Sequence, residues 1–220
     1  MKAYLSSHGL GPGIGALREI AGGNRTAIIV NALDHFPSAE RKRIVNDVIG
    51  IEPLFAGAGL LPKIIDLRES FETRSFGNFA DEFDIVWLTG GNCFVLQRAL
   101  VHSGMDRYLI DAVRDERIVY AGWSAGACVA GTSLRGLYQV DDPDIVPQGY
   151  PTFPAPESGL GFIEGTILPH FDSAHPESDD IGRAFKQLKR EGAVVTCLRD
   201  GEALLIANEN VRHISTERAA

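Results

Sequence analysis

The pentapeptide Gly122-Trp123-Ser124-Ala125-Gly126 places one hydroxyl between two glycines at the end of an apolar run. This G-x-S-x-G spacing is typical of a serine nucleophile on a sharp turn from a strand to a helix. The backbone at such a turn is strained, and glycines two residues to either side let the chain fold back without Cβ collisions. The pattern therefore predicts that the Ser124 hydroxyl is exposed where the strand ends and can attack a carbonyl carbon.

A serine that attacks a carbonyl also needs backbone N–H groups to stabilise the oxyanion that forms. The N–H of Ala125, at the start of the expected helix, is one candidate. Gly90 and Gly91 end another apolar strand, where bare backbone can approach a substrate closely, although a Gly-Gly pair can equally be a plain turn. Loss of one such donor typically slows a reaction by about 100 to 1,000-fold. We therefore expect two donors near Ser124.

At neutral pH the serine also needs a base that is held in place by a carboxylate. Among six histidines, His170 is the first choice because it ends the strand-like run GTILPH, which would bring it to the same sheet edge as Ser124. His175 lies at an expected helix start and His213 in the last expected strand. The remaining three lie in loop or helix-end contexts: His8, His35 and His102.

The carboxylate is less clearly defined by the sequence. Asp200 follows the apolar run VVTCLR, so it too is expected at a strand end, although Asp200-Gly201 is also a hairpin-turn signal. Glu202 would point to the same side if the strand continues, and Asp172 is close to His170 in sequence. Asp200 is the favoured acid, with Glu202 and Asp172 as alternatives.

The segments that must position these side chains alternate between β-rich runs and runs of helical period. This alternation predicts an α/β fold with a mostly parallel central sheet and helices on both faces, in one domain over residues 1–220. The runs DIVWL (84–88) and IVYAGW (118–123) lack strict alternation and should be central strands. Strands are expected within 2–7, 26–33, 60–68, 83–90, 117–123, 165–171, 192–201 and 203–215. Helices are expected near 38–50, 93–101, 104–115, 125–131 and 176–190.

Composition narrows the function classes. With 21 Lys and Arg against 29 Asp and Glu, the net charge is -8 and no basic block is present, which argues against a nucleic-acid partner. No apolar run reaches the roughly 18 residues needed to span a bilayer, and the N-terminus turns polar too early for a signal peptide, so a cytoplasmic protein is expected. The three cysteines, Cys93, Cys128 and Cys197, have no CxxC spacing and are expected to be free, mostly buried thiols.

Four motifs, GWSAGA, TGGN, LPHF and LRDG, resemble in order and spacing the peptidase E family of serine dipeptidases, over most of the chain. The resemblance implies a class I glutamine amidotransferase-like fold, a short peptide substrate, and neither metal nor cofactor. It implies Ser124 as nucleophile, His170 as base and Asp200 as third member, where the family commonly has Glu in a Pro-Glu-Gly run. It also implies that the N–H groups of Gly91 and Ala125 form the oxyanion hole. We expect a monomer or a small homo-oligomer.

The sequence departs from this family where the substrate is recognised. Members that remove an N-terminal aspartate use an Arg in a Gly-Glu-Thr-Arg run, whereas this chain reads HPESDDIGRAF, with Asp179 and Asp180 in that region. Binding of a substrate carboxylate needs a cation. Arg183, one helical turn further on, is the candidate, and Asn92 is a second candidate substrate-binding residue that could instead cap a helix.

Two other readings of the sequence compete with a peptidase. The run GPGIGA, from Gly11 to Ala16, fits the fingerprint of a dinucleotide-binding protein, and Asp34 ends the next strand as that fingerprint requires. Against this interpretation, Pro12 constrains the loop. An α/β-hydrolase would use Ser124, Asp200 and His213 in that order. That fold usually needs a longer chain.

Overall fold

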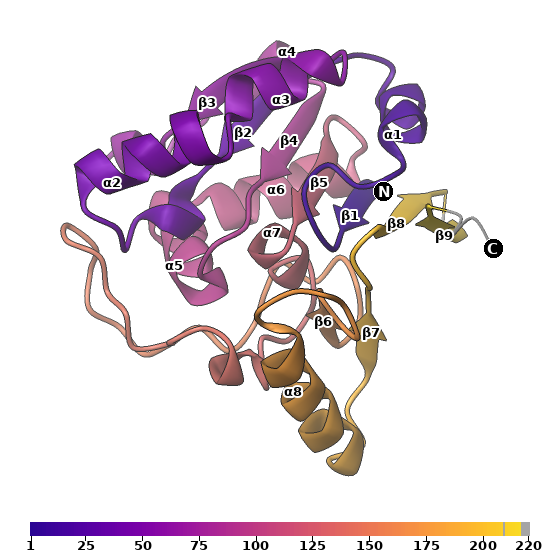
Figure 1. The fold of residues 1–220 in the computed structure, drawn as a ribbon. Coiled ribbons are helices and arrows are strands. Elements are labelled where there is room, and N and C mark those ends of the chain that lie inside the picture. The colour runs from indigo at the N-terminus through magenta and orange to yellow at the C-terminus, as the bar shows by residue number, and fades with distance from the viewer. Residues whose placement is uncertain (209, 217–220) are drawn as a thin grey trace.

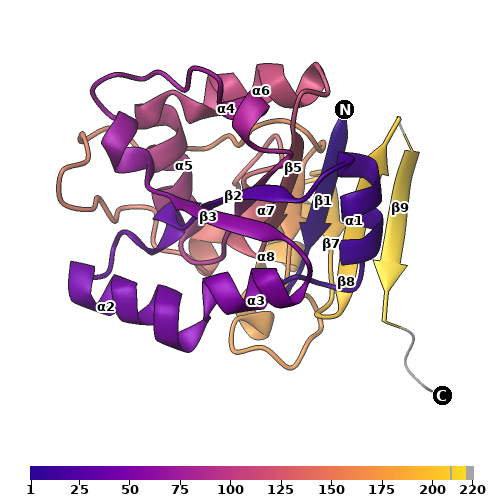
Figure 2. The same cartoon turned by 90° about the horizontal axis from the view of Figure 1, so that it is seen from above.

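The structure is a computed structural model that describes residues 1–208 and 210–216. Its main sheet has seven strands in the order β3-β2-β4-β5-β1-β8-β9 (Figures 1 and 2). The first five are parallel, whereas β8 runs antiparallel to β1, and β9 antiparallel to β8. The strands are β1 (Lys2–Ser6), β2 (Arg25–Ile29), β3 (Leu61–Ile65), β4 (Ile85–Leu88), β5 (Val119–Trp123), β8 (Glu202–Ala207) and β9 (Asn210–Ser215).

Strands β4 and β5 lie inside the sheet and are buried along their whole length, as the sequence predicts. In β4, Val86 and Leu88 face one hydrophobic cluster, whereas Ile85 and Trp87 face the other. A strand covered on both faces needs no polar alternation, which explains its continuous apolar run.

Helices cover both faces of the sheet, which gives three layers (Figure 2). One face packs on α4 (Phe79–Glu82), α5 (Cys93–Ser103), α6 (Met105–Arg114) and α7 (Ala125–Cys128), and the opposite face on α1 (Ile14–Ala21) and α3 (Ile51–Gly57). The predicted α/β class, with a mostly parallel sheet and a class I glutamine amidotransferase-like arrangement, is confirmed.

Two expected elements are each divided in the structure. The helix expected near 38–50 is α2 (Ser38–Arg43) followed by a π-helical segment, Ile44–Val48, and it ends at Gly50 with φ of 64°. The strand expected at 203–215 is the antiparallel pair β8 and β9, and Glu209, inside that range, lies outside the described residues.

The strands that precede His170 and Asp200 are not part of the main sheet, contrary to the sequence-based expectation of one shared edge. Strand β6 (Thr166–Leu168) and strand β7 (Val195–Cys197) form a separate two-stranded parallel sheet. Three-residue strands of this kind carry too little pattern to reveal their partner. Both nevertheless end close to β1. The N–H of His170, after β6, donates to Ser7 Oγ at 2.7 Å, and the Ser7 hydroxyl donates to the Asp200 carboxylate, after β7, at 2.8 Å.

The chain from 140 to 161, which is rich in Pro and Gly, contains no helix and no strand. The buried guanidinium of Arg98 on α5 holds this segment, donating to the carbonyls of Phe153 (2.6 Å) and Pro143 (3.1 Å). Helix α8 (Ser178–Arg190) lies below the sheet, next to β6 and β7 (Figure 1). All three cysteines are free thiols, and Cys93 and Cys128 are buried. Every helix among the described residues is too short or too polar to cross a bilayer.

Candidate active site

Ser124 stands on the sharp turn between β5 and α7, as its motif predicts. Its backbone has φ of 49° and ψ of −116°, a conformation that costs a non-glycine residue of order 1–3 kcal/mol. The flanking glycines are needed, since a Cβ at Gly122 would lie 2.7 Å from the Gly126 backbone and a Cβ at Gly126 would overlap the Leu88 carbonyl. The Ser124 side chain is partly exposed and accessible from outside.

A cavity of about 590 Å³ opens beside this serine. Both Ser124 and His170 line it, so the structure brings the predicted nucleophile and base to one space. No direct hydrogen bond joins the two side chains in the described part of the chain, and such contacts often tighten only when substrate binds. The lining residues are His8, Gly9, Leu10, Leu33, Val48, Ile49, Leu54, Gly90, Gly91, Trp123, Ser124, His170, His175 and Glu177.

His170 pairs with Asp200, and not with the alternative acids. The distance from Nδ1 of His170 to Oδ1 of Asp200 is 2.8 Å. Glu202 instead accepts from the Arg199 N–H at 2.7 Å, and Asp172 pairs with the Arg199 guanidinium at 2.7 Å. The sequence left three acids open, and the geometry places Asp200 against the imidazole.

Burial sets the charge state of this pair. Loss of solvent around the nearly fully buried imidazole lowers the pKa of His170 to about 4, although the Asp200 carboxylate opposes this shift. Burial raises the pKa of Asp200, but hydrogen bonds from Ser7 and His170 outweigh it and leave that pKa below its usual value. At neutral pH the pair is therefore a neutral imidazole and a carboxylate, with the Nδ1–H donated to Asp200 and the Nε2 lone pair free.

Ser7, one residue beyond β1, is a site residue that the sequence reasoning missed. Its hydroxyl donates to Oδ1 of Asp200 at 2.8 Å and accepts the His170 N–H at 2.7 Å, and its side chain is fully buried. The one sequence feature that could have indicated Ser7 as a site residue is its position as a polar residue directly after a buried parallel strand. Ser7 thus connects the main sheet to both members of the pair.

The two predicted oxyanion donors lie beside Ser124. Gly90 and Gly91 line the cavity, and a Cβ at Gly90 would lie 3.2 Å from Cβ of Ser124. Gly91 has φ of 132° and passes so close to Ala32 that a Cβ would lie 2.6 Å from its carbonyl oxygen. Within the described residues, neither the Gly91 N–H nor the Ala125 N–H donates a hydrogen bond to protein. Both amides are available to a ligand.

The two candidate substrate-binding residues have other partners. Asn92 Oδ1 caps α5 by accepting from the N–H groups of Phe94 (2.9 Å) and Val95 (3.0 Å). Arg183 pairs with Asp180 on the exposed side of α8 and is not among the residues that line the cavity. In the part of the chain that the structure describes, no Lys or Arg lines the cavity, whereas the Glu177 carboxyl does.

The residues that the competing readings require are not brought together. His213 lies 3.5 Å from Glu202 on the β8–β9 pair, away from the Ser124 cavity, so it does not serve as the base of an α/β-hydrolase triad. In the glycine-rich loop, the Tyr4 hydroxyl accepts the Gly13 N–H at 2.9 Å, so this amide is not available to a phosphate. Asp34 is buried and pairs with Arg41 at 2.7 Å.

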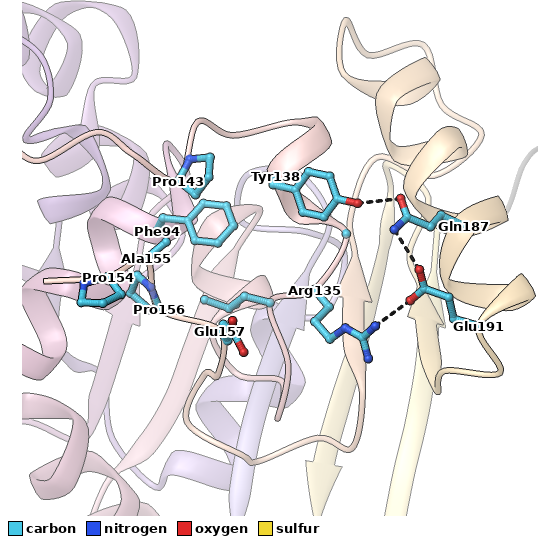
Figure 3. Close-up of a pocket in the computed structure, with 12 residues that line it drawn as sticks. Phe94, Arg135, Tyr138, Pro143, Pro154, Ala155, Pro156, Glu157, Gln187 and Glu191 are labelled. Carbon is cyan, nitrogen blue, oxygen red and sulfur yellow. Dashed lines mark hydrogen bonds and ion pairs between the residues drawn. The ribbon is translucent and has the colours of Figure 1, made fainter.

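A second cavity, of about 460 Å³, lies between the proline-rich segment 143–157 and helix α8 (Figure 3). Its rim is held by a hydrogen bond from the Tyr138 hydroxyl to Gln187 (2.8 Å) and by the Arg135–Glu191 ion pair (2.9 Å). None of the predicted site residues lines it, so the Ser124 cavity is the candidate active site.

The fold and the site together define an α/β protein with a serine elbow beside a histidine that is paired with a carboxylate. The sequence profile of peptidase family S51 matches residues 36–214, and the chain belongs to this family. This confirms the resemblance to peptidase E.

Individual relatives agree with this membership. Peptidase E of Streptomyces coelicolor is 33% identical over 134 residues, which is 59% of this chain and 51% of the relative. Peptidase E of Haemophilus influenzae is 32% identical over 137 residues, 59% of this chain and 53% of the relative. The chain thus spans about half the length of the curated relatives it matches.

Two crystal structures share the fold. A Listeria monocytogenes protein provisionally described as peptidase E superimposes with a TM-score of 0.74 at 17% identity, covering 98% of each chain. A peptidase from an acI-B1 Actinobacterium superimposes with a TM-score of 0.64 at 15% identity, covering 98% of this chain and 87% of the other.

Proposed function

We propose that this chain is a serine peptidase of the peptidase E type that cleaves short peptides through an acyl-enzyme. The observation that carries the proposal is the 2.8 Å contact between His170 Nδ1 and Asp200 Oδ1, beside a cavity that also contains Ser124 on its strained turn. A Ser-His-acid triad requires a carboxylate that orients the base in this way, with the serine in the same space.

The residues account for each step of such a reaction. The Ser124 hydroxyl attacks the peptide carbonyl, and Nε2 of His170 takes its proton, because Asp200 holds the ring with Nδ1 protonated. The free N–H groups of Gly91 and Ala125 stabilise the oxyanion. His170 then protonates the leaving amine, and a water molecule activated by the same imidazole hydrolyses the acyl-enzyme and releases Ser124.

The cavity supports a short substrate. Its volume of about 590 Å³ falls within the range of small-molecule sites, and a dipeptide fits that scale. Its lining offers Glu177 and no Lys or Arg within the described residues. A substrate aspartate would therefore find no cation to bind, so we expect dipeptides with an uncharged or basic first residue to be preferred over aspartyl dipeptides.

The test is labelling with a fluorophosphonate, which reacts only with an activated serine. Wild type should be modified at Ser124 on peptide mapping, and Ser124→Ala and His170→Ala should remain unlabelled while melting at temperatures close to wild type. Hydrolysis of a dipeptide library, followed by mass spectrometry, then defines the first-residue preference. Modification of another serine, or equal labelling of His170→Ala, would contradict the proposal.

A further inference from the structure

Three histidines meet at one wall of the cavity. His8 follows β1, His170 follows β6, and His175 lies five residues further on; one ring nitrogen from each lies within 4.8 Å of the other two. The His175 ring stacks on that of His170, with centroids 3.7 Å apart. His8 is exposed, His175 is partly exposed and His170 is buried, so the cluster can be reached from solvent on one side.

Carboxylates stand behind two of these rings. Asp200 is 2.8 Å from Nδ1 of His170, and Glu177 is 4.0 Å from Nδ1 of His175. A histidine that binds a metal through one nitrogen usually donates its other N–H to a carboxylate, which orients the ring and makes the ligand more basic. The cluster therefore has metal-ligating side chains together with the outer groups that support them.

We propose that His8, His170 and His175 bind one divalent transition-metal ion, zinc being the best match, and that the bound ion holds the serine site inactive. Three imidazoles with a fourth position open to water form a common zinc arrangement, with Zn–N distances of about 2.0–2.1 Å. Convergence on one ion requires His175 to tilt out of its stack. The polar contact given up is the 3.2 Å hydrogen bond from the Glu177 N–H to Nδ1, after which Nδ1–H can donate to the Glu177 carboxylate.

The inhibitory part of this inference rests on the proposed function. Asp200 occupies Nδ1 of His170, so a metal ion can use only the Nε2 lone pair, which is the one that would accept the Ser124 proton. Metal binding and proton abstraction therefore exclude each other. The ion would be a regulator that the reaction itself does not need.

Binding is measured first, because its readout does not depend on activity. Metal-free protein is titrated with zinc chloride by isothermal calorimetry, for wild type, His8→Ala and the matched control His213→Ala, whose imidazole is exposed on β9. We expect one zinc per wild-type and control chain, and at least about tenfold weaker binding by His8→Ala, since a lost ligand costs no less than a lost outer-shell partner. Equal zinc affinity of His8→Ala and wild type overturns the site.

Inhibition is then measured as the fluorophosphonate labelling rate with and without zinc, taken as a ratio for each protein. One equivalent of zinc should slow wild type and His213→Ala at least about tenfold, EDTA should restore the rate, and the ratio for His8→Ala should stay near one. Unchanged or faster labelling of zinc-loaded wild type overturns the inhibitory role. Absence of labelling even in metal-free wild type would refute the proposed function, while the calorimetric result on the zinc site would stand.

Discussion

The hydroxyl of Ser7 donates a 2.8 Å hydrogen bond to Oδ1 of Asp200, the same oxygen that faces the imidazole of His170. The same hydroxyl accepts the His170 N–H, so one buried group fixes both the backbone of the base and the position of its acid. The main sheet and the small β6–β7 sheet are connected at the point where the chemistry is expected.

Ser7→Ala should therefore slow labelling of Ser124 by about tenfold, because the His170 N–H is left without a partner, at about 1–3 kcal/mol, and Asp200 loses a donor. The pKa of Asp200 should rise, since the Ser7 hydrogen bond lowers it. The measurement is the labelling rate against pH. Ser6→Ala is the matched control, because the neighbouring Ser6 hydroxyl donates to the Gly9 carbonyl instead. Equal rates for the two variants would show that Ser7 has no positioning role.

The pH dependence of labelling should report the buried imidazole. Desolvation lowers the pKa of His170 to about 4, and only the neutral ring can accept a proton from Ser124. The rate should be low below that pH, rise as His170 loses its proton through about 4, and be flat from about pH 6 to about pH 8. An inflection near the ordinary histidine value of about 6.5 would instead mean that the imidazole is solvated.

Substitution of the acid tests which carboxylate completes the triad. Asp200→Asn should reduce the labelling rate by roughly 10²- to 10⁴-fold, because an amide cannot hold the tautomer with Nδ1 protonated. Glu202→Gln should stay within about twofold, since Glu202 pairs with the Arg199 N–H and His213. A larger loss in Glu202→Gln than in Asp200→Asn would reverse the assignment.

Two glycine substitutions should have opposite effects on stability. Gly182→Ala, inside α8, adds a Cβ with nothing within 4 Å and removes a poor helix former, so the free energy of unfolding should rise by about 0.5–1 kcal/mol. Gly126→Ala places a Cβ onto the Leu88 carbonyl and should leave little folded protein. Urea denaturation monitored by circular dichroism measures both, and a stable Gly126→Ala variant would contradict the packing described for the elbow.

The main sheet could be predicted because its strands carry strong local patterns. Strands β4 and β5 are buried along their whole length and have no polar alternation, as expected of strands covered on both faces, and both lie inside the sheet. The elbow was predictable for the same reason, since its glycines are required by contacts within a few residues or with the adjacent strand. Ser124 is therefore well defined by local sequence.

Features that depend on distant partners were not predictable. The residues of β6 and β7 pair with each other and not with the main sheet, and three-residue strands give no signal of that choice. The role of Ser7 arises from its contacts with His170 and Asp200, which lie 163 and 193 positions further along the chain. The choice of Asp200 over Glu202 depends on side-chain direction after a turn. In each case the decisive interaction depends on the three-dimensional arrangement of the chain, so no short stretch of sequence reveals it.

Because the backbone is left-handed at Ser124 (φ 49°) and His170 (φ 58°), relief of backbone strain and retention of the side chain are opposing requirements at these two positions. Glycine at either position would relax the main chain and delete a side chain of the proposed triad in the same step. A directed-evolution campaign that selects this chain only for heat tolerance is thus expected to admit inert glycine variants at these two positions, so each round needs a reactivity screen.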